Sequence, residues 1–155
     1  MLLYLGIGIH FMDKRGSFTT PQAARVLGIP MRKVLSYIER GYVGPSLRDA
    51  TGHGSSRQWD LWDVDKIYLI RQCELFGVSV KGLRTIGETL VPPLWPKVLL
   101  KNRDYPWLVM NRYGHIADLR LPLEEQMKTV GTPALVINWR DIMVEVQEMI
   151  DKTVL

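Results

Sequence analysis

The side chains best suited to bind another molecule lie between residues 20 and 57, where hydrogen-bond donors recur along the chain. Guanidinium, ammonium and hydroxyl groups are the donors that proteins use on phosphate oxygens and on the edges of DNA bases. The candidate DNA-binding residues are Thr20, Arg32, Lys33, Ser36, Tyr37, Arg40, Arg48, His53, Ser56 and Arg57. The same residue types also cover ordinary solvated surfaces, so the elements that position them must decide between the two interpretations.

The chain lacks the sequence patterns of the common catalytic sites. It contains no G-x-S-x-G, no Walker loop and no H-E-x-x-H. Glu124 and Glu125 are adjacent, so on a helix their carboxylates point apart and are typical of surface charge. The three histidines have no ligand spacing, and the single Cys73 lies in an apolar run that indicates a core residue. We therefore expect neither an enzyme nor a bound metal or other cofactor.

Two short helices are predicted to position the first donors. Thr20 is a good N-cap with Pro21 at the first helical position, and Gly28 is a suitable helix end. A second helix is predicted from Met31 to Arg40, where Arg32 and Lys33 occupy the first turn. Its apolar face consists of Val34, Leu35 and Ile38. Such a pair is either a helix-turn-helix or a generic αα-hairpin, because both have this apolar spacing.

A loop from Gly44 to Arg57 follows, rich in glycine, serine and basic residues. Its glycines permit a close approach to a phosphate backbone. Trp59, directly after it, is predicted to anchor the loop in the core. Two further helices are predicted over 61–76 and 80–90, the second capped by Ser79.

The order of these pieces resembles the N-terminal DNA-binding domain of the MerR family of transcriptional regulators. The matching motifs are T-x-x-x-A-A-x-x-L-G-I-P, Y-I-E-R-G-Y-V, R-Q-W and L-F-G-V-S-V-K-G-L, all within residues 17–90. The resemblance implies a winged helix-turn-helix, with the helix 31–40 in the major groove and the wing 44–57 on the phosphate backbone.

This sequence departs from the family pattern in three places. Ser36 stands where the family has an arginine, which puts close similarity of the operator sequence in doubt. Only one cysteine is present, whereas the metal- and redox-sensing members use several. A proline-containing segment from residue 91 stands where the family begins its long dimerisation helix.

The positive charge is concentrated in the proposed DNA-binding segment. Residues 13–57 carry eight basic and three acidic residues, whereas residues 91–155 carry eight of each. Binding to a polyanion requires such a local basic excess, although basic loops are also common on surfaces that bind nothing.

The last third of the chain is predicted to form a small αβ unit. Strands are expected at 107–110, 115–121 and 134–138, a short helix or irregular segment at 123–130, and a final helix at 142–154. A unit this small is marginal alone, so we expect it to pack on the first part or on a second copy. Its aromatic residues are either core or the lining of a pocket for an unknown small-molecule effector: Trp95, Tyr105, Trp107, Tyr113 and Trp139.

We therefore expect an α+β chain with a winged helix-turn-helix of four helices and a small wing, followed by about three short strands and a C-terminal helix. The predicted divisions are an N-terminal extension (1–16), the DNA-binding domain (17–90), a linker (91–104) and the αβ unit (105–155). The expected partners are double-stranded DNA and a second copy of the chain. Residues 1–12 are apolar but too short to span a bilayer, so we expect a cytoplasmic protein without a membrane partner. The alternative is a protein-interaction module, adaptor or antitoxin-like, on the same scaffold.

Overall fold

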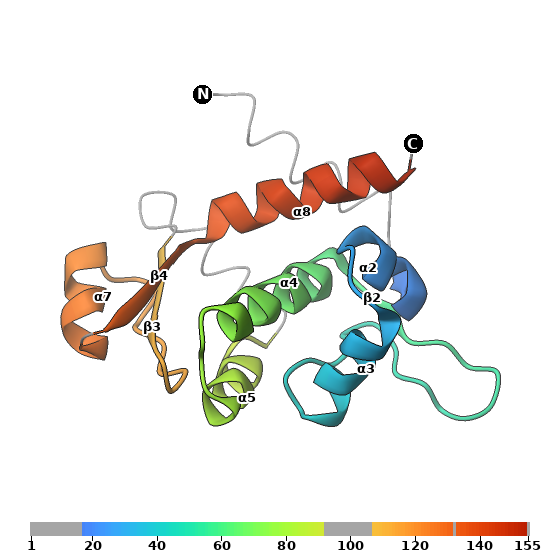
Figure 1. The fold of residues 1–155 in the computed structure, drawn as a ribbon, viewed down its shortest axis with the longest axis horizontal. Coiled ribbons are helices and arrows are strands. Elements are labelled where there is room, and N and C mark those ends of the chain that lie inside the picture. The colour runs from blue at the N-terminus through green and yellow to red at the C-terminus, as the bar shows by residue number, and fades with distance from the viewer. Residues whose placement is uncertain (1–16, 92–106, 132, 155) are drawn as a thin grey trace.

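The computed structural model describes residues 17–91, 107–131 and 133–154. The predicted extension 1–16, nearly all of the predicted linker, Trp95 and Tyr105 therefore lie outside the described residues. The first part contains β1 (Phe18–Thr19), α2 (Thr20–Val26), α3 (Met31–Glu39), β2 (Gln58–Trp59), α4 (Leu61–Leu75) and α5 (Val80–Thr89). The second part contains β3 (Trp107–Asn111), α7 (Leu123–Val130), β4 (Ala134–Asn138) and α8 (Trp139–Val154). These six helices and two antiparallel two-stranded sheets of the described ranges confirm a mixed α+β class (Figure 1).

Helix α2 begins one residue earlier than its sequence predicts. Thr19, not Thr20, is the N-cap: its hydroxyl accepts from the Gln22 amide at 3.4 Å, and the Gln22 side chain accepts from the Thr19 amide at 2.8 Å. This reciprocal capping box leaves Thr20 free to face inward. Gly28 has a φ of 61°, which confirms it as the residue that ends the first helix.

Helix α3 ends at Glu39, and Gly41 follows with a φ of 72°. Its two fully covered side chains are Val34 and Tyr37, whereas the predicted core residues Leu35 and Ile38 are half-buried. The inward face of α3 is therefore rotated toward Tyr37 relative to the prediction.

Strands β1 and β2 pair antiparallel, with Phe18 opposite Trp59, and a bridge between Arg48 and Gln58 closes the base of the loop. Trp59 is fully buried, which confirms its predicted role as the anchor of the loop. Beyond the bridge, residues 49–57 form a loop that extends from the molecule (Figure 1).

The second sheet has two strands instead of the three expected. β3 pairs antiparallel with β4, from Trp107 opposite Asn138 to Asn111 opposite Ala134. The predicted strand 115–121 contributes only one bridge, Met110 to Ile116, because Asp118 then closes a turn by accepting from the backbone and side chain of Arg120. Helix α8 starts at Trp139, three residues before the predicted start.

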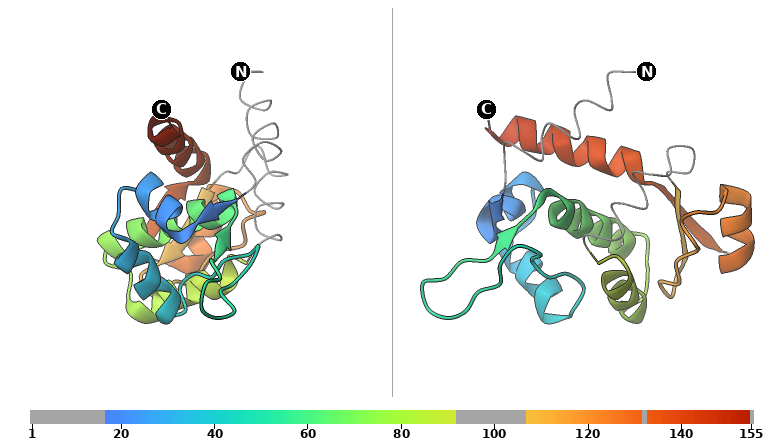
Figure 2. Two further views of the ribbon diagram at one scale, coloured as in Figure 1. Left: turned by 90° about the vertical axis from the view of Figure 1, so that its right-hand side faces the viewer. Right: turned by 180° about the vertical axis from the view of Figure 1, so that it is seen from behind.

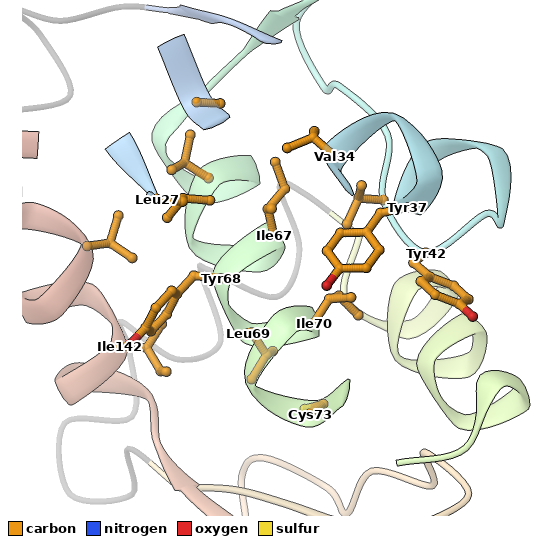
Figure 3. Close-up of a cluster of buried hydrophobic side chains, with 14 of the residues drawn as sticks. Leu27, Val34, Tyr37, Tyr42, Ile67, Tyr68, Leu69, Ile70, Cys73 and Ile142 are labelled. Atoms are coloured by element: carbon orange, nitrogen blue, oxygen red, sulfur yellow. The ribbon is translucent and has the colours of Figure 1, made fainter. Parts of the chain in front are cut away.

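Helix α4 forms the centre of the molecule. α8 lies along one side of α4 and also contacts α2, while α3 and α5 lie on the opposite side (Figures 1 and 2). Ile67 and Ile70 of α4 lie toward α3, and Tyr68 turns toward Ile142 of α8 (Figure 3). One continuous hydrophobic cluster therefore includes buried side chains from α2, α3, α4, α5, β3 and α8. The last third of the chain packs on the first part, as its small size predicts.

Candidate nucleic-acid interface

The outward side of α3 carries two exposed guanidinium groups, Arg32 in the first turn and Arg40 at the C-cap. Neither forms an ion pair with any described residue. Ser36, between them along the helix, is half-buried. Helix α3 lies on the side of α4 away from α8, and the 49–57 loop extends on this same side of the molecule (Figures 1 and 2). Arg32, Arg40 and the loop therefore belong to elements on one side of the molecule.

Lys33 and Tyr37 converge on a carboxylate of α4. The Lys33 ammonium lies 2.9 Å from Glu74 Oε2, and the Tyr37 hydroxyl donates to the same oxygen at 2.7 Å. Burial, reinforced by Glu74, raises the pKa of the Tyr37 hydroxyl. Burial of Glu74 alone would raise its pKa, but the hydrogen bonds from Tyr37 and Lys33 outweigh this effect and lower it. Tyr37, a predicted phosphate contact, is instead buried, and its hydroxyl is bonded within the protein.

Thr20, another predicted DNA contact, also points inward. It is buried, and its hydroxyl accepts a hydrogen bond from Trp59 Nε1 at 3.0 Å. This bond ties the first turn of α2 to the anchor of the loop. The role of Thr20 is therefore to fix the loop to the helix pair.

The loop donors are held by contacts within the loop. Arg57 Nε donates to Asp49 Oδ1 at 2.8 Å, and an Arg48 guanidinium nitrogen donates to the Ser56 carbonyl oxygen at 3.3 Å. His53 is exposed at the tip, between two glycines with φ values of 141° and 84°. Arg48 and His53 thus remain available to a partner, while the charge of Arg57 is offset by Asp49.

Arg84 of α5 extends this surface and was missed in the sequence. Arg84 Nε donates to the Arg40 carbonyl oxygen at 3.3 Å, so Arg84 lies beside the C-terminal end of α3. Lys81, one turn earlier on α5, is exposed. Their i, i+3 spacing opposite the buried Leu83 and Ile86 marked them as a solvated face, but only the packing of α5 shows that this face adjoins α3.

The cysteine and the aromatic residues of the last third do not form a common site among the described residues. Cys73 is buried, and burial raises the pKa of its thiol to about 12, which confirms a core role. Of the aromatic residues, Trp139 is buried in the main cluster, Trp107 packs on a separate small cluster and Tyr113 is exposed. Within the described ranges, no group of three or more His, Cys, Asp or Glu side chains could hold a metal ion.

Comparison with known proteins leaves the resemblance to regulators without further support. No protein-family model matches the chain, and no curated protein matches it. The described helices include none that is long and apolar enough to cross a membrane.

Proposed function

We propose that this protein binds double-stranded DNA as a winged helix-turn-helix transcriptional regulator. The observation that carries the proposal is the pair of exposed guanidinium groups of Arg32 and Arg40, in the first turn and at the C-cap of α3, which form no ion pair with a described residue, together with an exposed loop that contains Arg48 and His53. In this docking α3 enters the major groove, and residues 44–57 lie on the phosphate backbone. The order of the MerR-like motifs and the basic excess of residues 13–57 support the same arrangement.

The roles of the side chains follow from their positions. Arg32, in the first turn of α3, is placed to reach base edges, because this end of a recognition helix enters the groove. Arg40 and Arg84, at the other end of α3, are placed to contact phosphates. A single helix reads few base pairs, so we propose that two copies bind paired half-sites.

Two double variants of equal charge change test the proposal. Arg32→Ala with Arg40→Ala should weaken duplex binding and reduce the slope of log K against log salt by about one unit per lost phosphate contact. Lys128→Ala with Lys152→Ala removes two exposed charges from α7 and α8 and should leave the slope unchanged. Fluorescence anisotropy of a labelled duplex at several salt concentrations measures both. Equal effects of the two double variants, or no salt-dependent binding by the wild-type protein, would refute the proposal.

The base preference is tested separately. Selection of genomic DNA fragments by the purified protein should enrich one motif with two related half-sites. Arg32→Ala should relax the preference at one position of each half-site, since a bidentate arginine contact discriminates by about 1–3 kcal/mol.

A protein-interaction module is the second candidate, and one observation favours it. Leu75 and Phe76 are 67% and 69% exposed at the turn between α4 and α5, and Val80 is also exposed. Adjacent large apolar side chains on a surface are typical of contact sites. The test is copurification together with a duplex-binding assay. A stoichiometric protein partner that is lost on Phe76→Ser, in a protein with no affinity for duplex DNA, would favour the interaction module over DNA binding.

A further inference from the structure

A hollow of about 410 Å³ lies between the segment 41–46, which follows α3, and the C-terminal end of α5. Val43, Pro45 and Val91 contribute apolar side chains to its lining, and Glu88 is the one exposed acidic residue there. Lys66 of α4 also lines it. The volume falls within the range of pockets that hold small organic molecules.

Lys66 is the unusual group of this hollow. Its side chain is only 5% exposed, and its ammonium donates to the Gly87 carbonyl oxygen at 2.7 Å. An ammonium has three N–H donors, yet no second acceptor for Lys66 occurs among the described residues. Burial lowers the pKa of Lys66 to about 8, although the charge of Asp63 opposes this shift. A buried cation with unfilled donors is costly unless an acceptor reaches it.

Asp63, the acid of α4 whose charge acts on Lys66, uses one of its carboxylate oxygens elsewhere. Asp63 Oδ2 accepts from the amide and hydroxyl of Ser46, at 2.8 and 2.7 Å, and from the Asp60 amide. Lys66 therefore has no carboxylate partner within the described chain.

We propose that the hollow binds a small monocarboxylate with an apolar body, whose carboxylate accepts hydrogen bonds from Lys66. One ammonium balances one negative charge, and the apolar side chains of Val43, Pro45 and Val91 suit a hydrocarbon or aromatic body. Glu88 disfavours a phosphate or a second carboxylate by like-charge repulsion.

The position of the hollow gives this ligand a regulatory role, and this part rests on the proposed DNA binding. Residues 41–46 connect α3 to the loop, so a ligand bridging this segment and α5 biases the placement of both DNA-contacting elements. By linkage, the ligand and DNA must change each other's affinity by the same factor.

The test begins with binding alone, on the full chain and without DNA. Benzoate and hexanoate are the probes, benzyl alcohol is the neutral match for benzoate, and inorganic phosphate is the competing anion. Titration calorimetry gives the affinity, and backbone amide NMR shifts locate the site. Benzoate should bind saturably, at least about tenfold tighter than benzyl alcohol or phosphate. The shifts should cluster at residues 41–46 and 87–91.

Two variants assign the binding to Lys66. Lys66→Met keeps the length of the side chain and should abolish the preference for benzoate over benzyl alcohol. Glu88→Gln, at an exposed position, should tighten benzoate binding several-fold even if Lys66→Met fails to fold. The proposal would be overturned if benzoate showed no saturable binding, if benzyl alcohol bound equally well, or if phosphate bound more tightly. Lys66 would then serve only to donate a hydrogen bond to the Gly87 carbonyl oxygen near the end of α5. If benzoate binds as expected but does not change the affinity for duplex DNA, the ligand site is supported and its regulatory role is rejected.

Discussion

Helix α4 buries three charged residues near its N-terminus, Asp63, Asp65 and Lys66, and their hydrogen bonding differs. Asp63 is hydrogen-bonded, and Lys66 donates to a carbonyl oxygen. Asp65 is buried, and neither carboxylate oxygen has a hydrogen-bond partner in the described structure. Burial raises the pKa of Asp65 well above the usual value of 3.8, and the charge of Asp60 adds to this shift. Asp65 therefore costs folding free energy at neutral pH.

Asp65→Asn should increase the free energy of unfolding by about 1–3 kcal/mol at pH 7, because it removes a buried charge without changing the volume. The folded pKa of Asp65 is raised, so its penalty is absent below the unfolded value near 3.8 and grows as pH rises toward the folded value. The free energy of unfolding of the variant should thus equal that of the wild type near pH 3.5 and exceed it at higher pH. Urea unfolding across this pH range measures the difference. A constant difference, or a less stable variant at pH 7, would contradict this account.

At the scale of elements, the position of α3 depends on contacts with α4 and α5 that lie behind its DNA-facing side. Glu74 holds both Lys33 and Tyr37. The segment after α3 approaches α5 so closely that a Cβ on Gly87 would lie 2.2 Å from the Tyr42 carbonyl oxygen. These two contacts set where Arg32 and Arg40 are presented.

Glu74→Gln should have opposite effects on stability and on DNA affinity. It should lower the free energy of unfolding by about 1 kcal/mol, because the buried Tyr37 hydroxyl loses a charged acceptor. It should also release the Lys33 ammonium and strengthen duplex binding about threefold to tenfold at low salt. Glu145→Gln is the matched control, since Glu145 accepts from Tyr68 on the α8 side. If both variants bound duplex DNA more tightly, the gain would be explained by the loss of one negative charge and not by the release of Lys33.

Gly87→Ala should destabilise the protein by about 1–3 kcal/mol, because the new methyl group would collide with backbone that cannot rotate away. Intrinsic propensity alone would make alanine the better residue inside a helix by about 1 kcal/mol. Gly44→Ala is the control, since nothing lies within 4 Å of its Cβ position. Thermal unfolding of both variants decides whether the close contact outweighs propensity.

At the scale of the whole molecule, the two parts of the described chain share one core. Val146 and Ile150 of α8 are buried in the same cluster as Ile67 and Ala24 of the first part. The Tyr68 hydroxyl donates to Glu145 across the same contact. The last third of the chain therefore contributes to the stability of the helices that present the basic surface.

The protein should unfold in a single transition. Val146→Ala should lower the free energy of unfolding by about 1–3 kcal/mol and shift the transition of both parts equally, because its side chain is fully buried between them. Amide hydrogen–deuterium exchange monitored separately on α3 and on β4, across a urea series, measures the shift for each part. Loss of protection in α8 and β4 well before α3 would show two independent units.

The sequence alone predicted most elements close to their bounds, because their signals are local. Gly28 and Gly41 end helices whichever neighbours surround them, Ser79 caps α5, and the apolar spacing of 61–76 matches α4. It also predicted the buried Trp59 and Cys73. Two of its wrong predictions involve residues that are close in the sequence: Thr19 instead of Thr20 is the cap of α2, and a turn at Asp118 forms in place of a third strand.

Only the tertiary structure decided which donors remain available, because that depends on partners distant in the chain. Glu74, 37 residues from Tyr37 in the sequence, accepts a hydrogen bond from the Tyr37 hydroxyl. Trp59, 39 residues from Thr20, donates a hydrogen bond to the Thr20 hydroxyl. Both hydroxyls therefore point into the protein. Arg84 joins the basic surface because α5 packs beside the end of α3. Periodicity shows that a residue lies on a polar or apolar face of its own helix. Which neighbouring element covers that face, and whether it supplies an acid, is set by the packing of the whole chain.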